Sequence, residues 1–244
     1  MARRCLLLTR LGAPTSRGSG RLRLLAGMCL LRFRRGRAMT VVALVVYLVG
    51  LALAFGVRTW LQIRRTGSSG FHGISGSPGS LRWWAGVLFV LALVLGALSL
   101  VLAVVDVVPA PPGPDGLAYV GLVIAVTGSL GVLAAQTGMG AAWRIGVEET
   151  ERTDLVTDGW FAVVRNPIFT AMVTVQLGLT LMVPTWLSLA ALACLVVAVE
   201  LQVRLIEEPY LMRVHAADYP AYAGVTGRFV PAIGRFSRTG ATAR

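Results

Sequence analysis

Two polar segments carry most of the side chains that could bind a ligand or do chemistry. The first contains Arg165, Asn166 and Pro167, which stand directly before a long apolar run. Proline suits the first turn of a helix, where unpaired N–H groups and the helix dipole favour a negative group. The planar guanidinium of Arg165 can bind a carboxylate or phosphate through two hydrogen bonds. This segment therefore indicates an anion-binding position at the start of an apolar helix.

The second polar segment begins at Arg204 and contains the adjacent carboxylates Glu207 and Glu208. Carboxylates accept hydrogen bonds from ribose hydroxyls or from an amine. Aromatic side chains in both segments could stack on a base or face a cation. These aromatics are Trp160, Phe161, Phe169, Tyr210, Tyr219 and Tyr222. Together, the two segments suit a small ligand that carries both charges, hydroxyls and a ring.

Each of these features also has a purely structural interpretation. Arg165 at a helix end could extend to lipid headgroups. Glu207 and Glu208 could form surface pairs with Arg204 at helical spacing. The tyrosines at positions 219 and 222 could belong to an aromatic belt at the membrane surface. The residue types alone leave these alternatives open.

Metal and disulfide sites are not expected. His72 and His215 have no partner at catalytic or metal-ligand spacing, and the three cysteines show no CxxC pairing. The acidic stretch "EETERTD" at residues 148–154 is more typical of a solvated cap than of an active acid cluster.

The elements that position the polar segments are membrane helices. Of 244 residues, 56% are hydrophobic and 14% charged, with a mean hydropathy of +0.73, which indicates a polytopic membrane protein. The net charge of +12 comes from arginine alone, and ten of the 23 arginines precede Thr40. A nucleic-acid-binding surface would instead place basic residues among exposed aromatics on a folded domain, so nucleic acid is not an expected partner.

Apolar runs predict about five transmembrane helices. Three spans are expected at 40–57, 83–105 and 117–136, and the last of these carries small residues that would permit close helix contact. The apolar stretch 168–203 is too long for one span and short of two, so it is predicted to be a tight helical hairpin that turns at "VPTW". Because a hairpin returns to the side that it left, Arg165 and Asn166 should lie near Glu207 and Glu208.

The distribution of arginine predicts the orientation in the membrane. Arg58, Arg64, Arg65 and Arg82 should lie in a cytoplasmic loop, with the arginine-free turn 106–116 outside and both polar segments in the cytoplasm. With an odd number of spans this topology puts the arginine-rich residues 1–38 outside. Either the first span is not a simple crossing, or translation starts at Met39 or Met28, so that the residues before that methionine are not translated.

The order of the motifs resembles that of the isoprenylcysteine carboxyl methyltransferase family, which is related to the phospholipid N-methyltransferases. That family shows a glycine and an aromatic before Arg-His-Pro-x-Tyr, then a hydrophobic hairpin, Glu-Glu-x-x-Leu, spaced tyrosines and Arg-x-x-Pro. The corresponding residues, within 117–235, are Gly159, Phe161, "RNPIF" at 165–169, the 168–203 hairpin, "EEPYL" at 207–211, "YPAY" at 219–222 and "RFVP" at 228–231.

The resemblance implies an integral-membrane methyltransferase that uses S-adenosylmethionine, held on the cytoplasmic side, with a lipid-open tunnel for a lipophilic or lipidated substrate. It makes Arg165 and Asn166 the candidate catalytic residues. The candidate cofactor-binding residues are Gly159, Phe161, Arg165, Asn166, Pro167, Phe169, Glu207, Glu208, Tyr219 and Tyr222. We expect Asn166 and the backbone after Gly159 to position the reactants, Arg165 to bind a carboxylate of cofactor or substrate, and the two glutamates to bind the cofactor's hydroxyl or amino groups.

Two departures from the family pattern affect the expected chemistry. Asn166 replaces the usual histidine and Phe169 the usual tyrosine. Asparagine can hydrogen-bond but does not act as a base near neutral pH. A carboxylate acceptor is already ionised, so methyl transfer to it requires alignment and desolvation rather than proton removal. An amine acceptor would have to lose a proton, with Glu207 or Glu208 as the possible base.

The predicted organisation is an all-α integral membrane protein with an arginine-rich tail at 1–38, two transmembrane helices with their loops at 39–116, a methyltransferase-like core at 117–235 and a short tail at 236–244. The leading hypothesis is carboxyl O-methylation of an isoprenylcysteine-like or related amphiphilic acid. The alternatives are a phospholipid or amine N-methyltransferase, an NADPH-dependent reductase of the steroid-reductase type, and a non-catalytic membrane protein.

Overall fold

The computed structural model describes residues 19–67, 74, 76–108, 110–111, 113–114, 116–139 and 155–236. His72, the stretch at 148–154 and most of the Gly/Ser loop before Arg82 lie outside the described residues. The helices are α2 (Ser19–Leu51), η1 (Ala52–Val57, a π-helix), α3 (Arg58–Thr66), α4 (Leu81–Val104), α5 (Leu117–Gly138), α6 (Trp160–Val163), α7 (Pro167–Met182), α8 (Trp186–Leu201), η3 (Gln202–Glu207, a π-helix), α9 (Glu208–Val214) and α10 (Asp218–Val225). No strand occurs among these residues, which agrees with the predicted all-α class.

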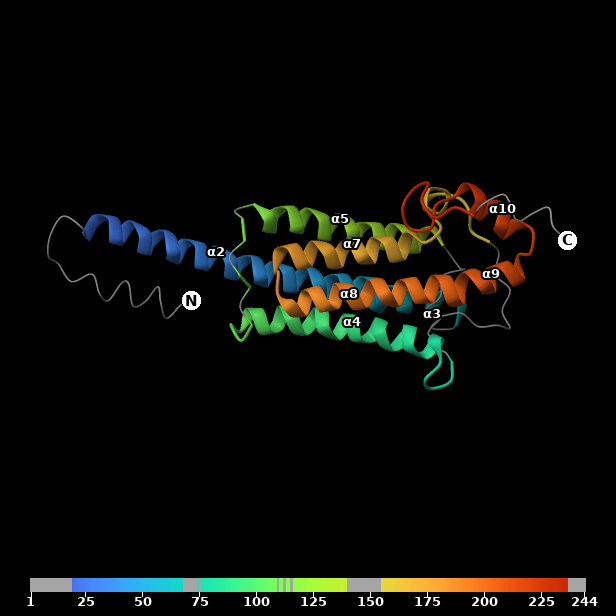
Figure 1. Ribbon diagram of the computed structural model, residues 1–244, viewed down its shortest axis with the longest axis horizontal. Coiled ribbons are helices and arrows are strands. Elements are labelled where there is room, and N and C mark those ends of the chain that lie inside the picture. The colour runs from blue at the N-terminus through green and yellow to red at the C-terminus, as the bar shows by residue number, and fades with distance from the viewer. Residues whose placement is uncertain are drawn as a thin grey trace.

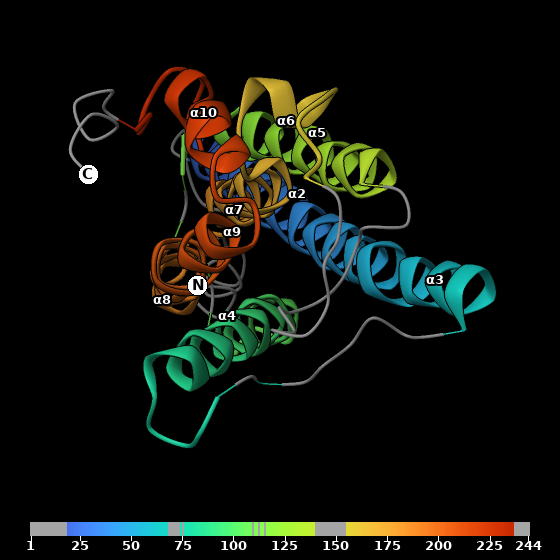
Figure 2. The same ribbon diagram turned by 90° about the vertical axis from the view of Figure 1, so that its right-hand side faces the viewer.

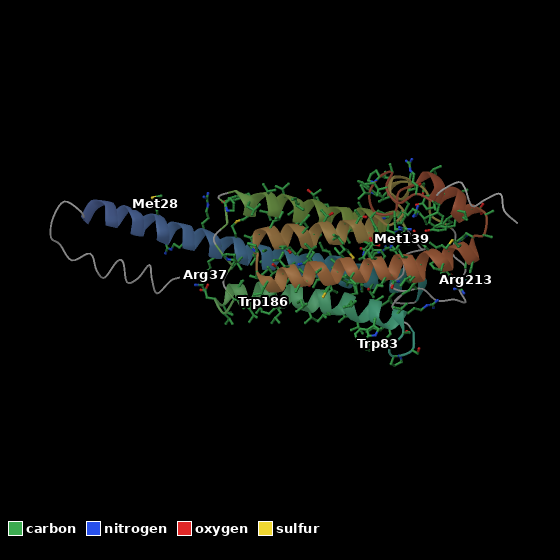
Figure 3. All side chains as sticks on the ribbon, in the orientation of Figure 1. Met28, Arg37, Trp83, Met139, Trp186 and Arg213 are labelled. Carbon is green, nitrogen blue, oxygen red and sulfur yellow. The ribbon has the colours of Figure 1, made fainter. Side chains whose placement is uncertain are left out.

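The long helices run side by side along one axis of the molecule (Figure 1). The most extensive contacts join α5 to α7 and α4 to α8, and α2 contacts α4, α5 and α7. The α4–α5 connection and the α7–α8 turn lie at one end of the bundle, whereas α6, α9 and α10 gather at the other. Trp186 lies at the first end, and Met139 and Arg213 lie at the second (Figure 3). Both polar segments are therefore at the same end of the bundle.

Within the described residues, four helical segments are long and apolar enough to cross a membrane: Arg34–Leu61, Leu81–Val104, Leu117–Gly138 and Trp186–Val214. Helix α7 is apolar but shorter, with 16 residues. At about 1.5 Å per residue it is roughly 24 Å long, less than the hydrocarbon thickness of about 30 Å. The helices predicted at 83–105 and 117–136 are confirmed within two residues, and the predicted segment 40–57 lies inside the first of these helical segments.

The predicted hairpin is confirmed. Helix α7 ends at Met182, and Thr185 caps α8 because its side chain accepts from the backbone of Ser188, while the Ser188 hydroxyl accepts from the backbone N–H of Thr185. The second arm is longer than expected, since η3 and α9 continue it to Val214. A helix-interior proline clashes with the carbonyl four residues earlier. The wide π-turn of η3 directly before Pro209 relieves that constraint, which explains why the helix continues into polar sequence.

The first helix also differs from the sequence prediction. It begins at Ser19 rather than near Thr40, and α3 carries it to Thr66, so Arg58 and Arg64 are helical instead of lying in a loop. Residues 15–77 contain no proline and are rich in leucine, alanine and arginine, which favour helix. Gly67 ends the helix with a positive φ of 73°.

Close packing of α5 on α7 holds the first polar segment in place. A Cβ atom added to Gly121 would lie 2.5 Å from the carbonyl oxygen of Gly178, and one added to Gly128 would lie 2.8 Å from the backbone nitrogen of Val175. The two backbones therefore approach each other through glycine, as the small residues predicted. This contact fixes α7, and with it Arg165 and Asn166 at its start.

Candidate active site

The two polar segments meet through their backbones. Val164 and Gly227 form an isolated parallel β-bridge. The N–H of Arg165 donates to the carbonyl of Gly227 at 2.8 Å, and the N–H of Asn166 donates to that of Arg228 at 3.1 Å. The chain after α10 therefore runs alongside the entrance to α7.

The side chain of Arg165 is buried, with 5% of the residue exposed. One terminal nitrogen donates to the carbonyls of Ala223 (2.9 Å) and Thr226 (2.7 Å). The other donates to Glu208 Oε1 (2.8 Å) and to the carbonyl of Gly234 (3.0 Å). The guanidinium also lies 5.0 Å from the ring centre of Phe236. Extension to lipid headgroups, the structural alternative for Arg165, is therefore wrong.

Glu208 is the buried carboxylate that joins the two segments. Its Oε1 accepts from Arg165 and from Arg228 Nε, and its Oε2 accepts from Arg228 Nη2, each at 2.8 Å. The hydrogen bond to Glu208 raises the pKa of the Arg228 guanidinium above its ordinary value. Arg204 pairs with Glu200 instead, so the surface pair considered for Glu208 does not form. We refer to Arg165, Glu208 and Arg228 as the ion triad.

Asn166 attaches the C-terminal segment to α7. Its side-chain Nδ2 donates to the carbonyl of Arg228 at 3.1 Å, the same oxygen that accepts from its backbone N–H. One turn later, the hydroxyl of Thr170 donates to the carbonyl of Phe229 at 2.9 Å. Pro167 occupies the first turn of α7, and the side chain of Asn166 at the N-cap makes no capping hydrogen bond. The first-turn N–H groups of α7 therefore keep their preference for an anion.

The aromatic residues of the two motifs are also brought together. The hydroxyl of Tyr222 donates to the carbonyl of Phe161 at 2.6 Å, which ties α10 to α6. Burial raises the pKa of Tyr222 to about 12, although the nearby Arg165 lowers it. Tyr219 is only 2% exposed and contacts Tyr222 and Phe236 edge-to-face. Burial raises the pKa of Tyr219 far above its ordinary value. A membrane-surface belt is therefore wrong for Tyr219.

The predicted site residues Glu207, Phe169 and Gly159 make none of the contacts described above. Glu207 is half-buried and accepts from Gln202 at 3.2 Å. Phe169 packs with Phe229 against an apolar cluster between α4 and α8. Gly159 is exposed and has a φ of 55°, and a Cβ atom added there would meet nothing within 4 Å. Space next to the backbone at the start of α6 is therefore open.

Sequence reasoning missed the contribution of Arg228. The "RFVP" motif contains it, but residue types alone did not indicate that its guanidinium binds Glu208 through two hydrogen bonds. Thr170 and Phe236 were also missed, because a threonine in an apolar helix and an aromatic near a chain end carry no distinctive signal. Among the described residues, no group of three His, Cys, Asp or Glu side chains could hold a metal ion.

Comparison with curated proteins and with solved structures gave no match. A family model does match. The matched stretch begins where α5 begins and ends at the first residue of α10, so it contains the α5–α7 contact, the hairpin, Arg165 and Glu208. It covers less than half of the chain. Residues 117–218 match the model of the phospholipid methyltransferase family, which supports this broader family of membrane methyltransferases rather than the isoprenylcysteine carboxyl methyltransferases specifically.

Proposed function

We propose that this chain is an integral-membrane methyltransferase that uses S-adenosylmethionine and methylates a lipophilic substrate. The observation that carries the proposal is the family match over 117–218, whose two motifs are joined at one end of the bundle by the pair between Arg165 and Glu208. The ordered resemblance of "RNPIF", "EEPYL" and "RFVP" to methyltransferase motifs agrees with that match and extends it to residues 228–231.

The groups around the ion triad suit the parts of S-adenosylmethionine. The uncapped start of α7 favours the cofactor's carboxylate. Glu207 offers a carboxylate for an ammonium or a ribose hydroxyl, and open space beside Gly159 admits a ligand close to the backbone. Trp160 is 54% exposed and offers a ring face on which a base can stack. When bound, the cofactor would supply the methyl group on its sulfonium.

The contacts of Arg165 suggest a different role from the one that the sequence predicts. Its terminal nitrogens donate to Glu208 and to three backbone carbonyls. We therefore propose that Arg165 and Glu208 position the site rather than bind the cofactor, and that Asn166 holds the segment after α10 against α7. On this view Glu207 and the start of α7 are the parts of the two motifs that touch the ligand.

The residues present favour a carboxylate as methyl acceptor. Asn166 provides no base near neutral pH, and Tyr222 keeps its proton because its pKa is about 12. A carboxylate needs no base, so the site has to exclude water and align the acceptor with the methyl group. We therefore propose carboxyl O-methylation of an isoprenylcysteine-like or related amphiphilic acid.

Amine N-methylation of a phospholipid is the second candidate. The description of the matched family favours it. An amine must lose its proton before attack, and Glu207, half-buried beside the ion triad, is the candidate base. The two candidates therefore differ in whether Glu207 is needed for methyl transfer itself or only for cofactor binding.

Cofactor binding tests the proposal. The detergent-purified protein should bind S-adenosylmethionine saturably and should not bind NADPH, as measured by isothermal titration calorimetry. Glu207→Gln should weaken binding of S-adenosylmethionine, whereas Glu200→Gln, an exposed change on the same long helix, should leave it unchanged. Binding of NADPH in place of S-adenosylmethionine would favour a reductase, and binding of neither would refute both enzyme classes.

A further inference from the structure

Two buried polar side chains lie outside both motifs, on helices that reach the active-site end of the bundle (Figure 1). Arg58, the first residue of α3, is 5% exposed, and Gln136, near the end of α5, is 4% exposed. Both belong to segments that are apolar enough to cross a membrane. A buried ionisable residue in such a segment is costly and commonly marks a functional position.

The π-helix η1 determines how these side chains are presented. The backbone N–H of Arg58 donates to the carbonyls of Leu53 and Phe55, while the carbonyl of Ala54 accepts from Gln136 Nε2 at 3.1 Å. An α-helix would pair Arg58 with Ala54. The bulge therefore shifts the register of the helix, and Ala54 and Arg58 are both buried. Such bulges often occur at functional sites.

The amide of Gln136 has an unused acceptor. Because the carbonyl of Ala54 requires an N–H donor, it fixes which end of the amide is nitrogen. Oε1 is then a buried oxygen with no hydrogen-bond partner among the described residues. In an apolar environment an unsatisfied acceptor of this kind costs free energy. A ligand that donates an N–H or O–H would satisfy it.

The location of these side chains links them to the proposed chemistry. Helix α5 contacts both η1 and α6, so its last turns lie between the π-helix and the element that begins the first motif. Viewed from the active-site end, α5 lies between α6 and the α2–α3 helix (Figure 2). Met139, directly after α5, marks the same end of the bundle (Figure 3).

We propose that Arg58 and Gln136 form the head-group subsite for the methyl acceptor, an inference that rests on the proposed function. Arg58 would bind an oxyanion of the head group, and Gln136 Oε1 would accept from a neighbouring N–H. The subsite thus takes amphiphiles that carry an oxyanion next to an N–H donor. Both an N-acylated S-prenylcysteine and a phosphoethanolamine lipid have this chemistry, through a carboxylate and a phosphate respectively.

Pairs of probes with and without the N–H test the subsite in the unmodified protein. N-acetyl-S-farnesylcysteine should bind about tenfold more tightly than S-farnesylthiopropionic acid, which keeps the carboxylate and the farnesyl chain but lacks the N–H. For the lipid source, dioleoylphosphatidylethanolamine should bind more tightly than dioleoylphosphatidylcholine, which lacks an N–H. Equilibrium dialysis in detergent measures all four affinities, and the pair that shows the difference identifies the source. Equal affinities within both pairs would overturn the inference.

Substitutions then assign the effect to residues. Gln136→Leu should remove the preference for the N–H-bearing probe and leave the affinity of the probe that lacks the N–H unchanged. Arg58→Gln should weaken both probes of the preferred pair by roughly thirtyfold, because a hydrogen bond to a charged group is lost. Arg64→Gln is the matched control, since Arg64 is exposed on the same helix and lies over Trp60. Circular dichroism confirms that each variant is folded.

The outcomes separate this inference from the proposed function. If the protein binds S-adenosylmethionine and Arg58→Gln and Gln136→Leu leave all probe affinities unchanged, the subsite is wrong and the methyltransferase proposal stands. If S-adenosylmethionine does not bind but the N–H preference is present and lost in Gln136→Leu, the subsite stands and the proposed function fails. Neither substitution should change the affinity for S-adenosylmethionine.

Discussion

Replacing Glu208 with alanine should destabilise the protein strongly, because this carboxylate pairs with both guanidinium groups of the ion triad. Its side chain is 6% exposed, and those of Arg165 and Arg228 are 1% and 15% exposed. Removing one member of a buried ion pair leaves an uncompensated charge and costs about 3–5 kcal/mol. Arg165 keeps three backbone carbonyls as acceptors. We therefore expect Glu208→Ala to lower the free energy of unfolding by about 3 kcal/mol, the lower end of that range.

The matched control for this substitution is Glu200→Ala. Glu200 pairs with Arg204 one turn away, and the two side chains are 38% and 54% exposed. An exposed helical pair contributes about 0.3–0.5 kcal/mol. For a chain of this size, about 3 kcal/mol corresponds to a fall in Tm of roughly 10 °C, and the control should change Tm by roughly 1 °C.

Thermal unfolding in detergent, followed by circular dichroism at 222 nm, measures both variants. The reasoning about the ion triad would be refuted if Glu208→Ala melted within about 2 °C of Glu200→Ala. The Arg228→Ala variant tests the interactions of the same triad a second time. Arg228→Ala should lower Tm less than Glu208→Ala does, because Arg165 then keeps Glu208 as its partner and Arg228 is the more exposed of the two arginines.

Three further predictions follow from the same contacts. Asn166→Leu should lower the free energy of unfolding by about 1 kcal/mol, because the hydrogen bond from Nδ2 to the carbonyl of Arg228 is lost. Asn166→His should retain a donor, so its Tm should be close to that of the unmodified protein. Equal Tm values for the two variants would contradict the role of Asn166 in holding the segment after α10. Gly128→Leu should force α5 away from α7 and prevent a cooperative melt, whereas Gly138→Leu, where an added Cβ meets nothing within 4 Å, should melt normally. The pKa of Tyr222 rises from its ordinary value of 10.0 to about 12 on folding, so the stability that its protonated hydroxyl contributes is complete below about pH 10 and is lost as the pH rises towards 12. In the Tyr222→Phe variant, the free energy of unfolding should therefore fall less between pH 10 and 11.5 than in the unmodified protein. An equal fall in both proteins would show that this hydroxyl is not buried.

Much of the membrane architecture was predictable because apolar runs and their interruptions record it directly. Pro184 within a continuous apolar stretch indicated the hairpin, and the hairpin in turn placed Arg165 beside Glu208. The extent of the helices was less predictable. Helix α9 continues into polar sequence because a π-turn accommodates Pro209, and such a local change of register has no clear signal in hydropathy.

The roles of the site residues were harder to predict than their location. A guanidinium that can bind a ligand carboxylate can equally bind a glutamate of its own chain. The sequence alone therefore does not tell whether Arg165 binds a ligand or Glu208. The decisive contacts come from backbone carbonyls at residues 223, 226 and 234, which have no side-chain signature. The buried acceptor on Gln136 was likewise invisible, since it depends on the carbonyl that η1 presents.

Methyl transfer in membranes tests the central claim most directly. Membranes that contain the protein should transfer radiolabel from methyl-labelled S-adenosylmethionine to the lipid-extractable fraction, at a rate well above membranes with the Glu207→Gln variant produced at the same level. A base-labile label would indicate a carboxyl ester, and a base-stable label an N-methyl group. Label no higher than in membranes lacking the protein, together with no binding of S-adenosylmethionine by the purified chain, would contradict the account.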